Sequence, residues 1–185
     1  MRTALILTGH MRCWPSVFPN TEKYVLERYK PDVFISTWDT EGYWISPEHD
    51  KTNQGTNPQS PMLNAGDVAA AYKPVGMVVH QQTSLDKYFD PIAEKLKPLC
   101  KEIRPKNIIS QFFKTYHGYQ MLANSMMMGN ERYDMVIRMR PDIIFEEELP
   151  DFDSQMVNVI DHPNHEGNGY GDMFLASSEY ISLDF

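Results

Sequence analysis

Apolar residues are grouped along the chain in short continuous runs that alternate with helical patterns. The first run, TALILTG, ends at Gly9 and is typical of a strand buried on both faces of a parallel sheet. Helix-compatible spacing follows from Pro15 to Tyr29, Pro31 ends it, and a second buried run, DVFISTW, comes next. Strand, helix and strand joined by short links predict an α/β fold with a parallel sheet.

The middle of the chain continues this alternation. We expect a short helix in NAGDVAAAY and a third strand in VGMVVHQ. The helical pattern that follows contains Pro91 and Pro98, so it predicts two helical pieces rather than one rod.

The clearest helical pattern begins at Ser110, which can cap a helix, and ends near Gly129. Its apolar stripe predicts the face that packs on the sheet, and consists of Phe112, Tyr116, Tyr119, Leu122, Ala123, Met126 and Met127. The strands VIRMRPDIIF and MVNVID follow, and after them come a glycine-rich loop, HEGNGYGD, and the segment MFLASSEYI. The whole predicts a single domain over residues 1–185, with a mostly parallel central sheet flanked by helices.

Composition and charge narrow the class of protein. Hydrophobic residues make up 42% and charged residues 23% of the chain, which excludes extensive disorder. The formal net charge of -8 argues against a nucleic-acid-binding protein. No apolar run approaches a membrane span or a signal peptide, and Cys13 and Cys100 fit two thiols better than a disulfide. We therefore expect a soluble, cytoplasmic protein without a transmembrane segment.

The strand VIRMRPDIIF carries charges that a buried strand does not need. Arg138, Arg140 and Asp142 stand among its apolar residues, and an unpaired buried charge is destabilising. Because side chains alternate along a strand, the two arginines face the same way. Ion pairs with neighbouring acidic residues would explain them as structure, and a ligand at the end of the strand would explain them as a site.

Polar residues follow the other strands too, and ligands of open α/β sheets bind beyond the carboxyl ends of the strands. The candidate site residues are Thr8, Gly9, His10 and Arg12 after the first strand, Trp38 and Asp39 after the second, and Arg138, Arg140 and Asp142 in the later one. A structural interpretation stays open for several of them: a turn for His10 and Asp39, and packing for Trp38.

Recognition of a diphosphate suits this set of residues. Guanidinium groups bind phosphate oxygens bidentately, and Gly9 lets the backbone approach a nucleotide closely. The carboxylate of Asp142 can hold Mg²⁺ or Mn²⁺, which prefer oxygen ligands. No Walker-type phosphate loop, dinucleotide fingerprint or nucleophile elbow is present, and His162 and His165 do not have the spacing of a zinc site.

The segments LTGHMRCW, PDVFISTWD, RYDMVIRMRPDIIF and GDMFLASSEYIS resemble, in this order, small GT-A-fold glycosyltransferases of bacterial surface-polysaccharide and large-virus glycan synthesis. The resemblance implies a GT-A-type fold and transfer of a sugar from a nucleotide diphosphate sugar, most simply a UDP-sugar, to a glycan acceptor.

In that family a strand commonly ends in Asp-any-Asp, which holds Mn²⁺ or Mg²⁺ on the donor. The corresponding residues here are Arg140, Pro141 and Asp142, so the resemblance gives Asp142 the metal and puts an arginine in place of the first carboxylate. It also makes Asp172 the candidate catalytic residue, as the base of an inverting transfer or as a group that orients the sugar in a retaining one.

Two alternatives stay open. One is another transferase that uses a phosphorylated donor, such as a nucleotidyltransferase or a sulfotransferase. The other is a non-catalytic module that binds a glycan or a partner and keeps the fold. Because many GT-A domains continue beyond a segment like SSEYISLDF, the chain resembles a truncated domain as well as a minimal enzyme.

Overall fold

A computed structural model gives the fold of the 185-residue chain. The structure describes residues 1–42, 60–98, 105–129, 132–152, 158–159 and 174–177. The predicted catalytic residue Asp172 and the histidines of its neighbourhood, His162 and His165, lie outside the described residues.

A six-stranded sheet forms the centre of the molecule. Its order is β3 (Gly76–His80), β2 (Asp32–Trp38), β1 (Thr3–Thr8), β4 (Met135–Met139), β6 (Phe174–Ser177) and β5 (Asn158–Val159). The first four strands are parallel, while β6 pairs antiparallel with both β4 and β5. The prediction of an α/β fold with a mostly parallel sheet is confirmed.

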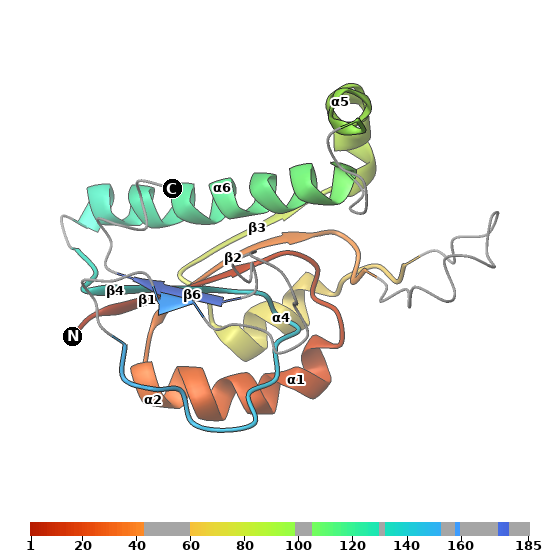
Figure 1. Ribbon diagram of the computed structural model, residues 1–185. Helices are drawn as coiled ribbons and strands as arrows, with labels where there is room; N and C mark the ends of the chain where they lie inside the picture. The colour runs from red at the N-terminus through yellow and green to blue at the C-terminus, as the bar shows by residue number, and fades with distance from the viewer. Residues whose placement is uncertain (43–59, 99–104, 130–131, 153–157, 160–173, 178–185) are drawn as a thin grey trace.

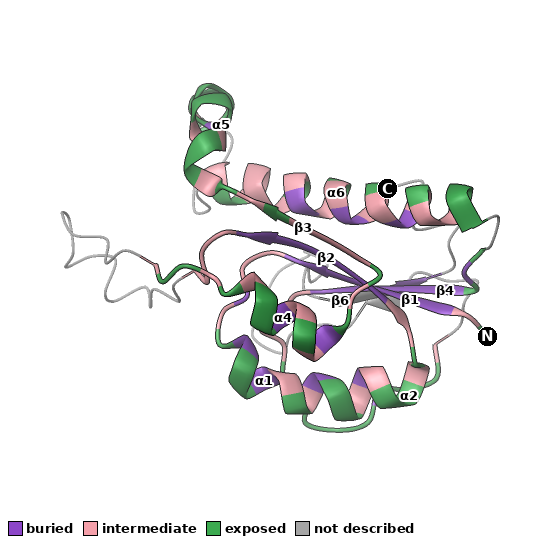
Figure 2. Ribbon diagram, turned by 180° about the vertical axis from the view of Figure 1, so that it is seen from behind, coloured by how far each residue is buried: buried purple, intermediate pink, exposed green. Residues whose placement is uncertain are grey.

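Helices cover both faces of this sheet (Figure 1). On one face lie α1 (Trp14–Thr21), α2 (Glu27–Tyr29) and α4 (Ala65–Tyr72), and a π-helical turn, Glu22–Leu26, joins the first two. The long helix α6 (Pro105–Gly129) runs along the other face, and α5 (Gln82–Leu96) packs against one end of it. Three layers result, with β1, β2 and β4 buried in the middle one and the edge strand β3 only partly buried (Figure 2).

The alternation of side chains along β1 divides the core into two parts. Leu5 and Leu7 belong to the larger apolar cluster, which includes residues of α1 and α4. Ala4 and Ile6 belong to a smaller cluster, which includes Leu122 of α6. Because both faces of the strand are covered, its six residues are all buried, as a continuous apolar run predicts.

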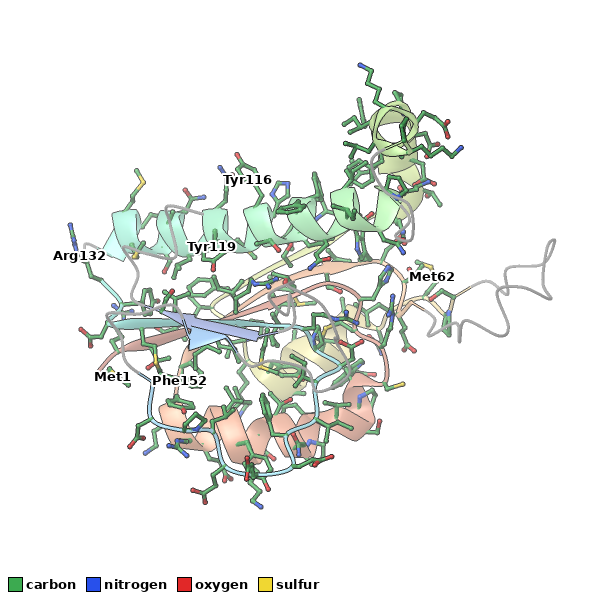
Figure 3. The ribbon with its side chains drawn as sticks, in the orientation of Figure 1. Met1, Met62, Tyr116, Tyr119, Arg132 and Phe152 are labelled. Atoms are coloured by element: carbon green, nitrogen blue, oxygen red, sulfur yellow. The ribbon has the colours of Figure 1, made fainter. Side chains whose placement is uncertain are left out.

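The predicted buried face of α6 is right only in part: Leu122 is fully buried and Tyr119 and Met126 pack against the smaller core cluster, but Phe112, Tyr116 and Met127 are exposed. Phe112 is 71% exposed and Met127 is 81% exposed, and the Tyr116 side chain points away from the sheet (Figure 3). The face that meets the sheet contains the buried residues Lys114, Gly118 and Leu122. Because Lys114 and Gly118 are not apolar side chains, a hydrophobic pattern does not identify this part of the face.

Gly118 sets how closely α6 approaches the sheet. A Cβ atom built on this glycine would lie 2.5 Å from Cγ2 of Ile6 and 3.2 Å from Cγ2 of Thr8, closer than packed carbon atoms come. Only a residue without a side chain fits between the helix and β1 at this distance.

The prediction that Pro91 divides its helix is also wrong, because α5 is continuous from Gln82 to Leu96. Lys106 of α6 contacts Asp86 at 2.8 Å and Asp90 at 2.9 Å, one turn apart on α5. Phe89 of α5 also packs on Phe113 of α6, with the ring centroids 5.4 Å apart. These contacts from α6 hold the turn that precedes the proline, so the helix tolerates the missing backbone hydrogen bond.

None of the helices in the described part of the chain is both long and apolar enough to cross a membrane. Cys13, which precedes α1, has an exposed free thiol.

Candidate functional site

A pocket of about 220 Å³ opens where β1, β2 and β4 end. The residues that line it are Thr8, Gly9, His10, Arg12, Trp38, Gln82, Asn107, Ser110, Gln111 and Arg140. Six of them were predicted from the strand ends. The parallel direction of these strands brings their carboxyl ends to one edge of the sheet, which is why residues far apart in sequence meet there.

The segment after β1 is shaped by glycine backbone. Gly9 has a φ of 116°, which side-chain-bearing residues rarely adopt, and its N–H donates to the carbonyl of Ser36 at 3.1 Å. Gly42, with a φ of 79°, lies so close to His10 that an added Cβ would be 2.6 Å from Cγ of the imidazole. The chain therefore turns sharply at Gly9, and the close contact with Gly42 restricts the His10 ring to one position.

His10 presents a neutral imidazole to the pocket. Burial lowers its pKa to about 4, against the opposing effect of its hydrogen bond to Thr40. Its Nδ1 lies 3.1 Å from the carbonyl oxygen of Thr40, and a carbonyl only accepts hydrogen bonds, so Nδ1 carries the proton. The remaining nitrogen, Nε2, is then a hydrogen-bond acceptor.

Two guanidinium groups line the pocket, and a carboxylate lies next to them. Arg140 donates to both oxygens of Asp142, from Nε at 2.9 Å and from Nη2 at 2.7 Å. Burial lowers the pKa of Arg12, and the positive charge of Arg140 lowers it further, while Asp142 acts in the opposite sense. Arg12 Nε is buried and has no hydrogen-bond partner among the described residues. The three groups together carry a net positive charge.

The partner of Asp142 in the structure is Arg140. Both of its carboxylate oxygens accept hydrogen bonds from Arg140. Within the described residues, no group of three His, Cys, Asp or Glu side chains is arranged to hold a metal ion. Each carboxylate oxygen of Asp142 keeps a lone pair beside its bond to Arg140, and the metal role of this aspartate stays a prediction.

Two other predicted residues lie near the pocket without lining it. Arg138 is only 8% exposed, on the face of the sheet that α6 covers, and its Nη1 donates to Thr115 Oγ1 at 3.4 Å. Asp39 accepts a hydrogen bond from the N–H of Gln82 at 3.1 Å and so caps the start of α5. Both residues hold neighbouring helices in place.

Trp38 forms part of the pocket wall but offers no open ring face. It is 1% exposed, its indole stacks on Phe113 with centroids 5.9 Å apart, and Lys114 Nζ lies 3.8 Å from its centroid. Of the two interpretations of Trp38, packing fits the structure.

The sequence did not predict the helical side of the pocket. Gln82 is the first residue of α5, and Asn107, Ser110 and Gln111 lie in the first two turns of α6. Asn107 lies outside the predicted helix because α6 begins at Pro105, five residues earlier than Ser110 suggested. A proline at the first helical position was the signal that could have placed this start.

Lys114 is a fully buried lysine next to the pocket wall. Its Nζ donates to the carbonyl of Thr37, lies 2.8 Å from His80 Nδ1 and contacts the face of Trp38. Burial lowers the pKa of Lys114 to about 7, and the charge of Asp39 opposes this. Burial and the charge of Lys114 also lower the pKa of His80, to about 4.

We expect the Lys114→Met substitution to remove a pH dependence of stability. Lys114 has a pKa of about 7 in the folded protein and an ordinary value of 10.5. Between these values the unfolded chain binds a proton that the folded protein has lost, so the free energy of unfolding rises with pH, by about 1.4 kcal/mol per pH unit. Below about pH 7 this contribution no longer changes.

Denaturant unfolding of both proteins across this pH window measures the effect. At each pH, the difference in the free energy of unfolding between wild type and Lys114→Met isolates the contribution of the lysine from that of other groups that titrate in the same pH range. If the free energies of unfolding of the two proteins changed with pH in parallel, Lys114 would not be a buried lysine with a lowered pKa.

Comparison of the chain with protein-family models, with curated proteins and with solved structures finds no match. The pocket itself therefore carries the argument for function.

Proposed function

We propose that the protein is a GT-A-type glycosyltransferase that moves a sugar from a nucleotide diphosphate sugar, most simply a UDP-sugar, to a glycan acceptor. The observation that carries this proposal is the pair of guanidinium groups, Arg12 and Arg140, at one pocket beyond the carboxyl ends of the parallel strands. The resemblance of the segments around these residues to small glycosyltransferases supports the same function.

A diphosphate complements this end of the pocket. The two arginines repel each other, as the lowered pKa of Arg12 indicates, and Asp142 offsets only one of their charges. An anion between them would relieve the repulsion and would accept hydrogen bonds from the guanidinium groups.

In the transfer, the acceptor hydroxyl oxygen forms a bond to the anomeric carbon of the sugar, and the bond from that carbon to the diphosphate oxygen breaks. The diphosphate leaves with the electron pair of the broken bond, and Arg12 and Arg140 stabilise the negative charge that develops on it. We assign the acceptor proton to the carboxylate of Asp172 in an inverting reaction.

We propose that arginine carries the role that a divalent cation has in Asp-any-Asp enzymes. Arg140 donates two short hydrogen bonds to the Asp142 carboxylate, so a positive group already lies beside the only acidic residue that corresponds to the Asp-any-Asp motif. The cation would add positive charge at the leaving diphosphate where the arginines already supply it.

Calorimetric titration of UDP, GDP and their sugar conjugates, each with and without Mn²⁺, tests the proposal. We expect one nucleotide to bind with a dissociation constant on the order of micromolar, and its affinity to change little when Mn²⁺ is removed. Binding that requires Mn²⁺ and fails in Asp142→Ala would instead identify Asp142 as a metal ligand. A protein that binds none of these ligands would refute the transferase. Binding without turnover in the presence of glycan acceptors would favour the non-catalytic module.

A further inference from the structure

The pocket has a second, uncharged side that the arginines do not explain. It is formed by the carboxamides of Gln82, Asn107 and Gln111, which come from the starts of α5 and α6. We infer that this carboxamide side binds the vicinal hydroxyl groups of a sugar ring. The inference rests on the proposed function, because the sugar ring is taken to be part of a ligand whose phosphates meet Arg12 and Arg140.

The two helices hold these carboxamides in fixed positions. Asn107 and Gln111 are four residues apart on α6, so they lie on the same face of the helix and line the same pocket. The backbone of Gln82 is fixed by its hydrogen bond to Asp39. Lys106, at the start of α6, forms ion pairs with Asp86 and Asp90 of α5 and so links the two helices.

Carboxamides match a diol in hydrogen-bonding capacity. Each one offers two N–H donors and a carbonyl acceptor, and each hydroxyl of a sugar both donates and accepts. The neutral His10 adds an acceptor nitrogen, and Ser110 and Thr8 add hydroxyl groups. Among the described residues that line the pocket, the charged donors for an anion are the arginines, so the uncharged side suits the neutral part of the ligand.

The aromatic residues of the pocket favour a sugar over a nucleobase on this side. Bases are commonly bound by stacking on an open aromatic face. Trp38 is almost completely buried beneath Phe113 and Lys114, and the His10 ring is covered by Gly42. The volume of about 220 Å³ is also below the roughly 300–1,000 Å³ of pockets for whole drug-sized ligands, so it fits one part of a nucleotide sugar.

Binding of pyrophosphate, UDP, 2′-deoxy-UDP and UDP-glucose to Gln82→Ala and Asn107→Ala variants tests the inference. Asn124→Ala is the matched control, since Asn124 is an exposed carboxamide on the same helix and does not line the pocket. We expect each pocket variant to bind its sugar-bearing ligand about tenfold more weakly than wild type does, which corresponds to loss of about one hydrogen bond. Pyrophosphate affinity should stay as in the control.

The choice of ligands identifies which sugar ring is bound. If it is the ribose, the loss appears with UDP and vanishes with 2′-deoxy-UDP. If it is the transferred sugar, the loss appears with UDP-glucose and not with UDP. Equal affinities of Gln82→Ala, Asn107→Ala and Asn124→Ala for all ligands would overturn the carboxamide subsite while leaving the diphosphate site intact. A wild-type protein that binds neither pyrophosphate nor any of the UDP and GDP ligands would overturn the proposed function, and this inference with it.

Discussion

Replacing Gly118 with valine is expected to lower the free energy of unfolding by about 3 kcal/mol, equivalent to a fall in Tm of roughly 10 °C. The first carbon of the new side chain would lie 2.5 Å from Cγ2 of Ile6, which is fully buried in β1 and cannot move away. Helix α6 would have to lift from the sheet, and Leu122 would lose part of its packing with it. Thermal unfolding followed by circular dichroism measures the change.

Gly129→Val is the matched control on the same helix. A Cβ at Gly129 would meet no atom within 4 Å, and this glycine does not have a positive φ. Its substitution should change the free energy of unfolding by less than about 0.5 kcal/mol, as is usual at an exposed site. Equal effects at the two glycines would mean that α6 does not lie as close to β1 as the structure places it.

The second large effect concerns Arg140. We expect Arg140→Ala to bind UDP about 100-fold more weakly than wild type does, because it loses charge-assisted hydrogen bonds to the diphosphate. Arg140→Lys should lose about tenfold, since it keeps the charge but lacks the planar fork of the guanidinium. Isothermal titration calorimetry at one fixed salt concentration measures both.

Arg28→Ala provides the control for a lost arginine. Arg28 donates to Asp151 at 3.0 Å, so the variant also breaks an arginine–aspartate pair, but on α2, which covers the opposite face of the sheet from α6. Its affinity for UDP should equal that of wild type. If Arg140→Ala and Arg28→Ala bind UDP equally well, Arg140 serves only as a structural partner of Asp142.

Much of the fold was predictable because it depends on local patterns. The continuous apolar runs of β1 and β2 indicate strands covered on both faces, and the structure buries them in that way. Residues that follow parallel strands must meet at one edge of the sheet, which is why Thr8, Trp38 and Arg140 could be placed in one pocket before the structure was known.

The errors come from contacts between distant elements. The buried face of α6 is decided by the shape of the sheet below it, where Gly118 allows close approach and Lys114 finds the carbonyl of Thr37. The hydrophobic pattern identified Leu122 but also included Phe112 and Tyr116, which are exposed. The roles of Gln82 and Asn107 likewise depend on how α5 and α6 pack against each other, which no local spacing encodes.

Binding of a nucleotide diphosphate in this pocket can be tested by following backbone amide resonances while UDP is added. We expect the amides of Gly9, His10 and Arg12 after β1, and of Gln82 at the start of α5, to shift together with one dissociation constant. Shifts confined to other parts of the chain, or no shifts at saturating UDP, would contradict it.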